Sequence, residues 1–552
     1  MITDSRSIPA NTELKCDLCI VGAGAAGITL ALQFVRSKFS ILVLESGGEK
    51  LEAEQQVLNN GEVVDGVHPP AHMYRQRRLG GSTAIWGGRC VPLDEQDFQK
   101  RDHVPLSGWP FERSTLQPFY ERAQTLLEAG VFDYSASSAL RQGDGLVQGF
   151  RDPDISTESL ERFSPPTNFW KRYRTELAKS APIVVIKRAT CLRLTGDRVV
   201  TAVECAGIGD ERFKVCARLV VLAVGGLETV RVLAHSGCGN HSRMLGRTYM
   251  CHIEAALGQL RLSPTSRGVQ FGFERTNDGV YCRRRFTLRP EKQGTLGILN
   301  AAIRLSHAGV VDPSHRHPVL SAMYLAKKLL IPEYARKFTV VEHEAMRNSR
   351  NDLGLWLQQA RNVMFGAPKL AIFALDWGIR RHLTYRRIPS VALPNAAGVY
   401  WLDFNGEQSP NLESRVLLSD ETDRYGVPKL RVDWRTSELD WLTLSRMLRE
   451  LRRAAEACRS GTVEYDGERL DQDARAAVVP VGGHHIGTAR MSESPSAGVV
   501  NADCRVHHVE NLYVAGCATF PTSGQANPML TLVAMALRLA RHLETRLDDQ
   551  SV

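Results

Sequence analysis

The sequence contains no long hydrophobic run. Within its 552 residues, no window reaches the ~18 uninterrupted apolar residues that a membrane-spanning helix needs. The first residues, MITDSRSIPANTELK, hold neither the apolar segment of a secretory signal nor a twin arginine. The sequence therefore predicts neither a transmembrane helix nor export, and we expect a cytoplasmic location.

The sequence also lacks the clustered cysteines of a disulfide scaffold or a metal site. Its 12 cysteines are scattered singly, which suits reduced thiols. One CxxC pair, Cys16 and Cys19, lies in the apolar run CDLCIVGAG and has no second Cys/His pair nearby. We therefore predict a buried strand there rather than a redox or metal site, and we expect no bound metal.

A strong charge of one sign is missing as well. The chain carries 69 Lys and Arg against 60 Asp and Glu, a formal charge of +9. This excess is too small to indicate a nucleic-acid-binding protein and favours anionic partners only weakly. With 43% hydrophobic and 23% charged residues, the composition is that of a globular protein. At roughly 150 residues per domain, the length predicts more than one structural unit.

The most informative N-terminal feature is a glycine motif between two expected strands. Gly22, Gly24 and Gly27 form GxGxxG, and Glu45 follows 18 residues after the last of them. The order strand, glycines, helix, strand and acid is typical of a dinucleotide-binding unit. The expected elements are a strand at Leu18–Val21, a helix at Ile28–Val35 and a strand at Ile41–Leu44.

Each position of this motif has a physical task. Gly22 permits the tight turn, Gly24 lets the backbone approach a pyrophosphate, and Gly27 allows the helix to pack closely on the strand. The helix N-terminus offers N–H groups to the phosphates. Glu45 can accept hydrogen bonds from ribose hydroxyls and disfavours a 2′-phosphate, which favours FAD or NAD over NADP.

Two further segments carry glycine pairs. LGGSTAIWGG, residues 79–88, predicts a loop that passes close to a flat ligand, or a tight loop around a core Trp. Leu219–Val224 predicts a late strand of the nucleotide-binding sheet, followed by a helix from about Leu227. The region around 183–205 alternates like antiparallel strands.

The middle of the chain, from about 256 to 475, lacks such glycine motifs. Short β-like runs alternate there with helical stretches: Ala255–Leu262, Arg415–Leu418 and Leu430–Trp434. Two stretches, 319–338 and 353–387, are apolar, basic and aromatic together. We expect amphipathic helices packed over a substrate domain. The alternative is a surface that rests on a membrane or holds a lipid-linked substrate.

The C-terminal region holds the densest set of polar motifs. Asn511–Val514 predicts a strand that leads into Ala515 and Gly516. Asn527 is expected as the N-cap of a long helix with Pro528 at its first position. Four histidines flank these elements: His484, His485, His507 and His508. The last two are expected in a turn and are assigned no chemistry.

Three ordered blocks resemble the glucose–methanol–choline (GMC) oxidoreductases. They are GAGAAG with Glu45, GGSTAIWGG, and HHIGTARM followed by NLYVAG, FPTSG and ANPMLT. The fit looks closest to the sugar-oxidising branch, which includes pyranose oxidase-like and gluconate or fructose dehydrogenase-like flavoproteins. The resemblance implies an α/β fold: a Rossmann-like, discontinuous FAD-binding domain and an α+β substrate domain with a mainly antiparallel sheet. We expect residues 1–100, 180–255 and 476–552 in the first domain, and 101–179 and 256–475 in the second.

The resemblance also implies a catalytic pair at His484 and Asn527. His484 would accept the proton of the substrate hydroxyl while hydride leaves for flavin N5, and Asn527 would donate a hydrogen bond to the same oxygen. His485 is the alternative base, and Asn527 could instead only cap the helix. The positive end of that helix would favour reduced, anionic flavin.

The resemblance places FAD against residues of all three blocks. These are Gly22, Gly24, Ala25, Ala26, Gly27 and Glu45, then Gly80, Gly81, Ser82, Thr83, Trp86 and Gly87, then Ala515, Gly516, Pro528 and Met529. Some members of the branch tether FAD through a His beside the Trp, but here that neighbour is Ile85, so non-covalent FAD is expected. No haem-attachment CxxCH is present, so the electron acceptor (oxygen, a quinone or a redox protein) should be a separate molecule.

The function expected from the sequence is FAD-dependent oxidation of a CH–OH group, on a sugar or glycoside secondary hydroxyl, by a dehydrogenase or oxidase. Two alternatives stay open. One is the same chemistry on a sterol, terpenoid or natural-product alcohol. The other is a non-redox lyase of the same fold that retains FAD.

Overall fold

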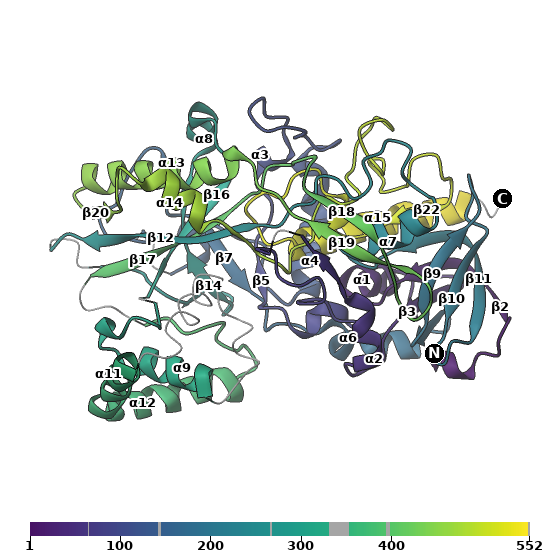
Figure 1. Cartoon of the computed structure of the whole chain (residues 1–552), viewed down its shortest axis with the longest axis horizontal. Coiled ribbons are helices and arrows are strands. Elements are labelled where there is room, and N and C mark those ends of the chain that lie inside the picture. Colours follow the sequence, from purple (N-terminus) through teal and green to yellow (C-terminus); the bar gives the residue numbers. More distant parts are fainter. Residues whose placement is uncertain are drawn as a thin grey trace.

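Two large β-sheets lie toward opposite ends of the molecule (Figure 1). The structure is a computed structural model, and it describes residues 1–64, 66–141, 145–264, 268–307, 309–329, 353–393 and 398–549. Within those ranges no helix has the length and apolar character needed to cross a bilayer.

The first sheet is mostly parallel and runs in the order β1-β8-β3-β2-β11-β10-β9, with β22 beside β11. The pairs from β1 to β11 and the β11–β22 pair are parallel, whereas β10 is antiparallel to both β11 and β9. The strands are β1 (Ile2–Asp4), β2 (Glu13–Val21), β3 (Ile41–Glu45), β8 (Ile183–Lys187), β9 (Thr190–Thr195), β10 (Ala202–Ala206), β11 (Arg212–Leu222) and β22 (Leu512–Val514).

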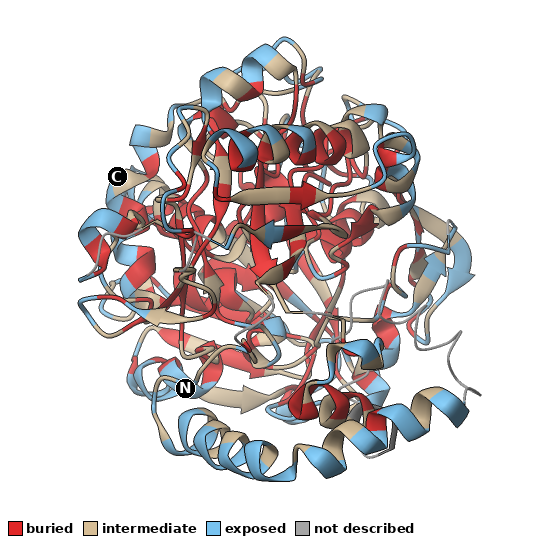
Figure 2. Cartoon of the chain, turned by 90° about the vertical axis from the view of Figure 1, so that its left-hand side faces the viewer, coloured by how far each residue is buried: buried red, intermediate tan, exposed pale blue. Residues whose placement is uncertain are grey.

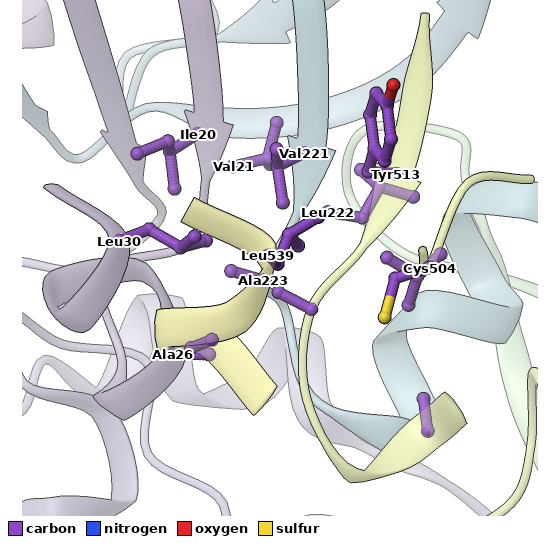
Figure 3. Packing of buried hydrophobic residues seen from close by; sticks show 14 of the residues in the cluster. Ile20, Val21, Ala26, Leu30, Val221, Leu222, Ala223, Cys504, Tyr513 and Leu539 are labelled. Atoms are coloured by element: carbon purple, nitrogen blue, oxygen red, sulfur yellow. The ribbon is translucent and has the colours of Figure 1, made fainter. Parts of the chain in front are cut away.

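Helices cover this sheet because its central strands are apolar on both faces. Leu30 of α1 and Leu539 of α15 lie near Ile20 of β2 and Leu222 of β11 in one continuous core (Figure 3). The helices on this side of the molecule are α1 (Ala25–Gln33), α4 (Gln117–Leu126), α6 (Phe169–Lys179), α7 (Gly226–His235) and α15 (Met529–Asp549). The predicted strands and helices of the glycine segment and of residues 219–235 are thereby confirmed.

The second sheet is antiparallel, in the order β20-β12-β17-β16-β15-β6, with β21 beside β12. The apolar faces of α13 (Glu438–Ala457) and α14 (Leu470–Ala477) complete its core. The strands are β6 (Ile155–Ser156), β12 (Ile253–Leu262), β15 (Phe286–Leu288), β16 (Ala301–Ser306), β17 (Val399–Gly406), β20 (Gly461–Glu464) and β21 (Val479–Pro480). The architecture is that of the expected α/β fold with a second, mainly antiparallel unit.

Two smaller sheets complete the body. One has the order β13-β14-β7-β5, and the other the order β18-β19-β4. Their strands are β4 (Gly61–Val63), β5 (Arg89–Cys90), β7 (Leu160–Phe163), β13 (Glu274–Arg275), β14 (Tyr281–Arg284), β18 (Arg415–Thr422) and β19 (Pro428–Asp433). Short helices are α2 (Ala53–Gln56), α3 (Glu95–Phe98), α5 (Ala136–Ala139) and α8 (Pro290–Leu296). The domain boundaries expected from the sequence stay a prediction.

Three helices form a separate group below the antiparallel sheet in the view of Figure 1. They are α9 (Pro318–Leu329), α11 (Leu353–Phe365) and α12 (Ala367–Gly378), followed by a π-helical turn at Ile379–Leu383. They pack mainly against one another, with a small apolar core of their own. The apolar residues of α11 and α12 serve this local core or face outward, so the expected packing over the substrate domain is not seen for these two helices. The end of the same stretch does reach the body, because Tyr385 and Arg386 hydrogen-bond to Glu128. Residues 330–338 of the first stretch lie outside the described residues.

The two local cysteine and histidine predictions are confirmed. Cys16 and Cys19 both lie in β2, and Cys19 is fully buried. All 12 cysteines are free. His507 and His508 lie in the turn that precedes β22.

Candidate active site

The glycine motif forms a tight loop between β2 and α1. Gly22 has a φ of +103°, and a Cβ there would come within 2.6 Å of the Ala223 carbonyl oxygen. A Cβ on Gly27 would lie 1.9 Å from the Gly22 carbonyl oxygen, so close packing requires glycine at both positions. At Gly24, by contrast, no atom lies within 4 Å of the Cβ position. Gly24 therefore leaves open space in front of the N-terminus of α1, where a pyrophosphate would sit.

Glu45 ends β3 beside this loop. Its carboxylate accepts hydrogen bonds from the backbone N–H groups of Ala23 and Gly47, both at 2.9 Å. Burial raises the pKa of Glu45 to about 7, although the two N–H groups act in the opposite direction. Each carboxylate oxygen keeps a second lone pair, which suits the hydroxyl groups of a ribose.

The second glycine block folds directly against the first. Residues 81–84 form a 3₁₀ turn, and the Gly80 N–H donates to the Ala23 carbonyl at 2.8 Å. A Cβ on Gly81 would lie 3.1 Å from the Gly24 Cα. The Thr83 hydroxyl accepts a hydrogen bond from the Phe169 N–H, and the Trp86 indole donates to the Thr167 carbonyl at 3.1 Å. The two blocks thus enclose one space, with Trp86 fixed at its side.

Two more strands end at the same edge of the parallel sheet. Gly225 follows β11 with open space at its Cβ position. Gly516 follows β22 with a φ of +121°, and its nearest Cβ neighbour is at 4.0 Å. Glycines or an acid therefore end four neighbouring strands, β3, β2, β11 and β22, at the carboxyl edge where parallel sheets bind ligands. These residues fit the phosphate, ribose and flat ring system of a flavin dinucleotide.

His484 and Asn527 come together, as the sequence predicts. The Asn527 Nδ2 atom lies 3.2 Å from His484 Nε2, across 43 residues of chain. Both side chains are half-buried. The helix α15 begins at Met529, and the Pro528 carbonyl accepts a hydrogen bond from the Leu532 N–H at 2.8 Å. The expected cap is therefore off by one residue: Pro528 takes the cap position, because the Asn527 side chain is engaged with His484.

A series of hydrogen bonds sets the direction of the Asn527 amide. The Arg89 guanidinium, which can only donate, lies 3.3 Å from Asn527 Oδ1. Nδ2 must then face His484, so His484 Nε2 is the acceptor and its ring proton lies on Nδ1. That proton is shared with His252, because the two Nδ1 atoms are 3.0 Å apart. His484 therefore presents the Nε2 lone pair, the form that a general base requires.

The electrostatics of the site keep both imidazoles neutral. Burial, with contributions from His252 and Arg89, holds the pKa of His484 well below its ordinary value. Burial lowers the pKa of His252 to about 4, against a raising effect of backbone groups of Ser523 and Ala526. His252 can thus accept the Nδ1–H hydrogen bond of His484 without taking the proton.

His485 belongs to a different, buried network. Its Nδ1 lies 2.7 Å from the Tyr249 hydroxyl, which is also 2.8 Å from His68 Nε2 and 3.2 Å from Cys251 Sγ. Ligand atoms of the two histidines and the cysteine lie within 4.8 Å of one another, a spacing that a metal ion could bridge. The Tyr249 hydroxyl already joins all three groups by hydrogen bonds. Of the adjacent histidines, the structure therefore brings His484, and not His485, to Asn527.

A cluster of charged residues, here called the charged wall, lies next to Asn527. Arg89 Nε lies 3.6 Å from Glu161, and Arg304 pairs with Glu161 at 3.1 Å and with Asp403 at 2.9 Å. Burial alone would raise the pKa of Glu161, but Arg89 and Arg304 hold it at about 2. Burial and then Asp403 raise the pKa of Glu254 in the same cluster. The surroundings of the pair are thus rich in hydrogen-bonding groups.

Two of the residues expected to bind cofactor are exposed to solvent, unlike the rest. The Ser82 side chain is exposed, and its hydroxyl donates to the Tyr74 carbonyl at 2.9 Å. Gly87 is also exposed, with open space at its Cβ position. Ala25 and Ala26 form the first turn of α1, and Ala515 is bonded to Leu222 at the sheet edge. Pro528 and Met529 are half-buried at the start of α15.

Arg89 and His252 were not predicted from the sequence. Arg89 lies just after the GGSTAIWGG block, a position that could have drawn attention. His252 is 232 residues before His484 and lies in no motif that we recognised. The structural signal for His252 is its position directly before a strand. The next residue, Ile253, pairs with Pro480 in the segment before His484.

The chain is similar in sequence and in fold to several known proteins. Residues 410–536 match the family model described as GMC oxidoreductase. Over 98% of its length the chain is 22% identical to 6'''-hydroxyparomomycin C oxidase of Streptomyces lividus, of which the match covers 93%. A C-glycoside 3-oxidase of Arthrobacter globiformis is 35% identical over 141 residues, 25% of each chain. An FAD-dependent oxidoreductase from Chaetomium thermophilum has the same fold, with a TM-score of 0.54 at 15% identity over 96% of this chain and 99% of that one. The C-terminal part of this chain is thus similar to the GMC oxidoreductases, and the whole chain shares the fold of an FAD-dependent oxidoreductase and is similar in sequence to a hydroxyparomomycin oxidase.

Proposed function

We propose that the protein oxidises a secondary alcohol of a sugar or glycoside, with His484 as the general base. The observation that carries the proposal is the series of hydrogen bonds that runs from Arg89 through Asn527 and His484 to His252. This series leaves the Nε2 lone pair of His484 beside an amide N–H of Asn527. A base and a donor at one point are what the oxygen of an alcohol requires.

The chain's own residues account for the proton. A substrate hydroxyl placed within reach of both side chains would donate to His484 Nε2 and accept from Asn527 Nδ2. As Nε2 takes the proton, the Nδ1–H bond to His252 holds the imidazolium in place. When bound, FAD would supply the acceptor for the hydride that leaves the carbinol carbon. The adjacent N-terminus of α15 presents its positive end to that region.

The charged wall favours a polyhydroxylated substrate. Arg89, Glu161 and Glu254 lie around the Asn527 side of the site and offer donors and acceptors to several hydroxyls. An apolar sterol or terpenoid has few hydroxyls to offer these charged groups, whereas each hydroxyl of a sugar can add a charge-assisted hydrogen bond. The names of two relatives, a hydroxyparomomycin oxidase and a C-glycoside 3-oxidase, point the same way.

We further propose that FAD is held without a covalent bond. Ile85, which precedes Trp86, carries no nucleophile that could form one, and its side chain is 42% exposed. Acid precipitation should therefore release all yellow colour into the supernatant, and colour retained in the pellet would contradict this.

We also propose that the electron acceptor is a separate molecule: oxygen, a quinone or a redox protein.

The test of the proposed function is anaerobic mixing of the FAD-loaded protein with sugars, glycosides and apolar alcohols. Bleaching of the flavin absorbance by sugars or glycosides is the expected result. Bleaching only by sterols or terpenoid alcohols would replace the substrate class while keeping the chemistry. Flavin that stays oxidised with every alcohol, while a cyanohydrin is cleaved, would instead show the non-redox lyase.

A further inference from the structure

Helix α12 is apolar on two opposite faces, and only one of them is covered. Leu370 and Phe373 pack into the local core with Val319 and Leu320 of α9. Ile372, Leu375, Ile379 and Leu383 follow at intervals of three and four residues, which places them together on the other side. None of the residues of α12 is buried. An amphipathic helix needs one apolar face for packing, so the second face requires another explanation.

This second face is the most exposed apolar surface of the described residues. Of all the described residues, ten large hydrophobic side chains are more than 60% exposed, and eight of these ten lie between residues 353 and 385. Leu375 is 69% exposed and Leu383 79%. On the neighbouring α11, Leu353, Leu357 and Met364 repeat at helical spacing and are exposed as well. The long helices along the lower edge of Figure 2 are accordingly pale blue and tan. Soluble surfaces rarely gather apolar groups in this way without a partner.

Positive charge is concentrated in the same segment. Residues 353–387 contain six cations and one acid, Asp376, a net of +5 out of the +9 of the whole chain. The cations are Arg361, Lys369, Arg380, Arg381, Arg386 and Arg387. An apolar strip bordered by Lys and Arg is typical of helices that lie in the interface of an anionic membrane.

The charges also decide between possible occupants. A second copy of this chain would pair the same face with itself, as isologous dimers do, and would bring two surfaces of +5 together. That arrangement is repulsive. A bilayer with anionic headgroups satisfies the cations and buries the aliphatic side chains at once.

We propose that the outer face of α11, α12 and the following π-helical turn docks the protein on an anionic lipid bilayer. The helices lie in the interface without spanning it, since no described helix is long and apolar enough to cross. Ile372, Leu375, Ile379 and Leu383 insert among the acyl chains, while Arg380 and Arg387 meet the headgroups. The attachment is reversible and weakens with added salt.

The test is sedimentation of the full FAD-loaded chain with vesicles of equal parts phosphatidylglycerol and phosphatidylcholine. The double variant Leu375→Glu/Leu383→Glu changes two exposed side chains and should lower the bound fraction by at least ~10-fold. Val199→Glu is the matched control, since Val199 is 42% exposed in the β9–β10 turn at the other end of the molecule (Figure 1) and should bind as the wild type does. Unchanged flavin content and thermal unfolding would show that both variants fold.

Three results would overturn the proposal. The wild type could fail to sediment with anionic vesicles, or sediment equally with vesicles of phosphatidylcholine alone. The double variant could sediment as well as the wild type. A wild type that elutes as a dimer while the double variant elutes as a monomer, with no vesicle binding by either, would assign the face to self-association instead.

Discussion

Arg89 Nη1 lies 3.3 Å from Asn527 Oδ1, and this contact decides which end of the amide faces His484. Because a guanidinium only donates, it turns the Asn527 N–H toward the imidazole. The same cation lowers the pKa of His484, after the larger effects of burial and of His252. Arg89 therefore acts on the base in two ways, through geometry and through charge.

Replacing Arg89 by Met should move the acid limb of flavin reduction to higher pH. His484 accepts a proton only when neutral, and loss of a nearby positive charge raises its pKa toward the ordinary value. Reduction should thus begin to fail at a higher pH in the variant than in the wild type. Arg89→Lys, which keeps the charge, should hold the acid limb near its original place. Anaerobic stopped-flow rates across pH measure both, and coincident limbs in all three proteins would contradict the assignment.

His252→Phe should slow flavin reduction by about 10²-fold while FAD stays bound, because a base without its Nδ1 partner loses its orientation. His252→Asn supplies a carbonyl that can accept the same N–H bond and should recover part of the rate. Limiting rates at saturating substrate separate this effect from weaker binding. Equal rates for the Phe variant and the wild type would show that the contact between the two Nδ1 atoms has no role.

Gly24→Val should lower the FAD content by at least ~10-fold, because its side chain would occupy the space where the pyrophosphate approaches the N-terminus of α1. Gly294→Ala in α8 is the control, since it too has no atom within 4 Å of its Cβ position but lies away from the site. The ratio of flavin to protein absorbance reports the outcome. A Gly24→Val protein that purifies fully yellow would refute the placement of the cofactor.

Glu228 is a buried carboxylate that pairs with Arg77 at 2.6 Å, Arg75 at 3.1 Å and Arg231 at 3.3 Å. Burial would raise its pKa, but the three arginines hold it at about 2, below its ordinary 4.5. A carboxyl with a lowered pKa stabilises the fold above its ordinary pKa, and this stability is lost as the pH falls from 4.5 toward 2.

Glu228→Gln should therefore cost about 3–5 kcal/mol at neutral pH, since it leaves buried cations without their partner. Its stability should also fall less than that of the wild type as the pH drops through the acid window. Urea unfolding at neutral pH and inside that window measures both effects. Parallel losses of stability in the two proteins would contradict the role given to Glu228.

The sequence was most informative where function depends on neighbouring residues. Gly22, Gly24 and Gly27 lie in one turn, so their spacing alone predicted the loop and the strands around it. His484 and Asn527 were found through motifs, although 43 residues separate them. His252 was not found, because its partner is 232 residues away and a buried His on a strand has no local pattern. The start of α15 was placed one residue early, because capping and site contacts compete for the Asn527 side chain.

The helices at 353–387 show a second limit. Their periodicity correctly predicted amphipathic elements, but a pattern of apolar residues does not say which surface covers them. The covered face of α12 meets α9, whereas Ile372 and Leu375 on its other face are 72% and 69% exposed.

We propose that His484, and not its neighbour His485, takes the substrate proton. The most direct measurement is anaerobic flavin reduction, by the alcohol that bleaches the wild type, in His484→Ala and His485→Gln side by side. We expect His484→Ala to keep its FAD and lose at least ~10² in the reduction rate, whereas His485→Gln stays within a few-fold of the wild type. Near-normal reduction in His484→Ala, with the large loss in His485→Gln, would contradict the claim.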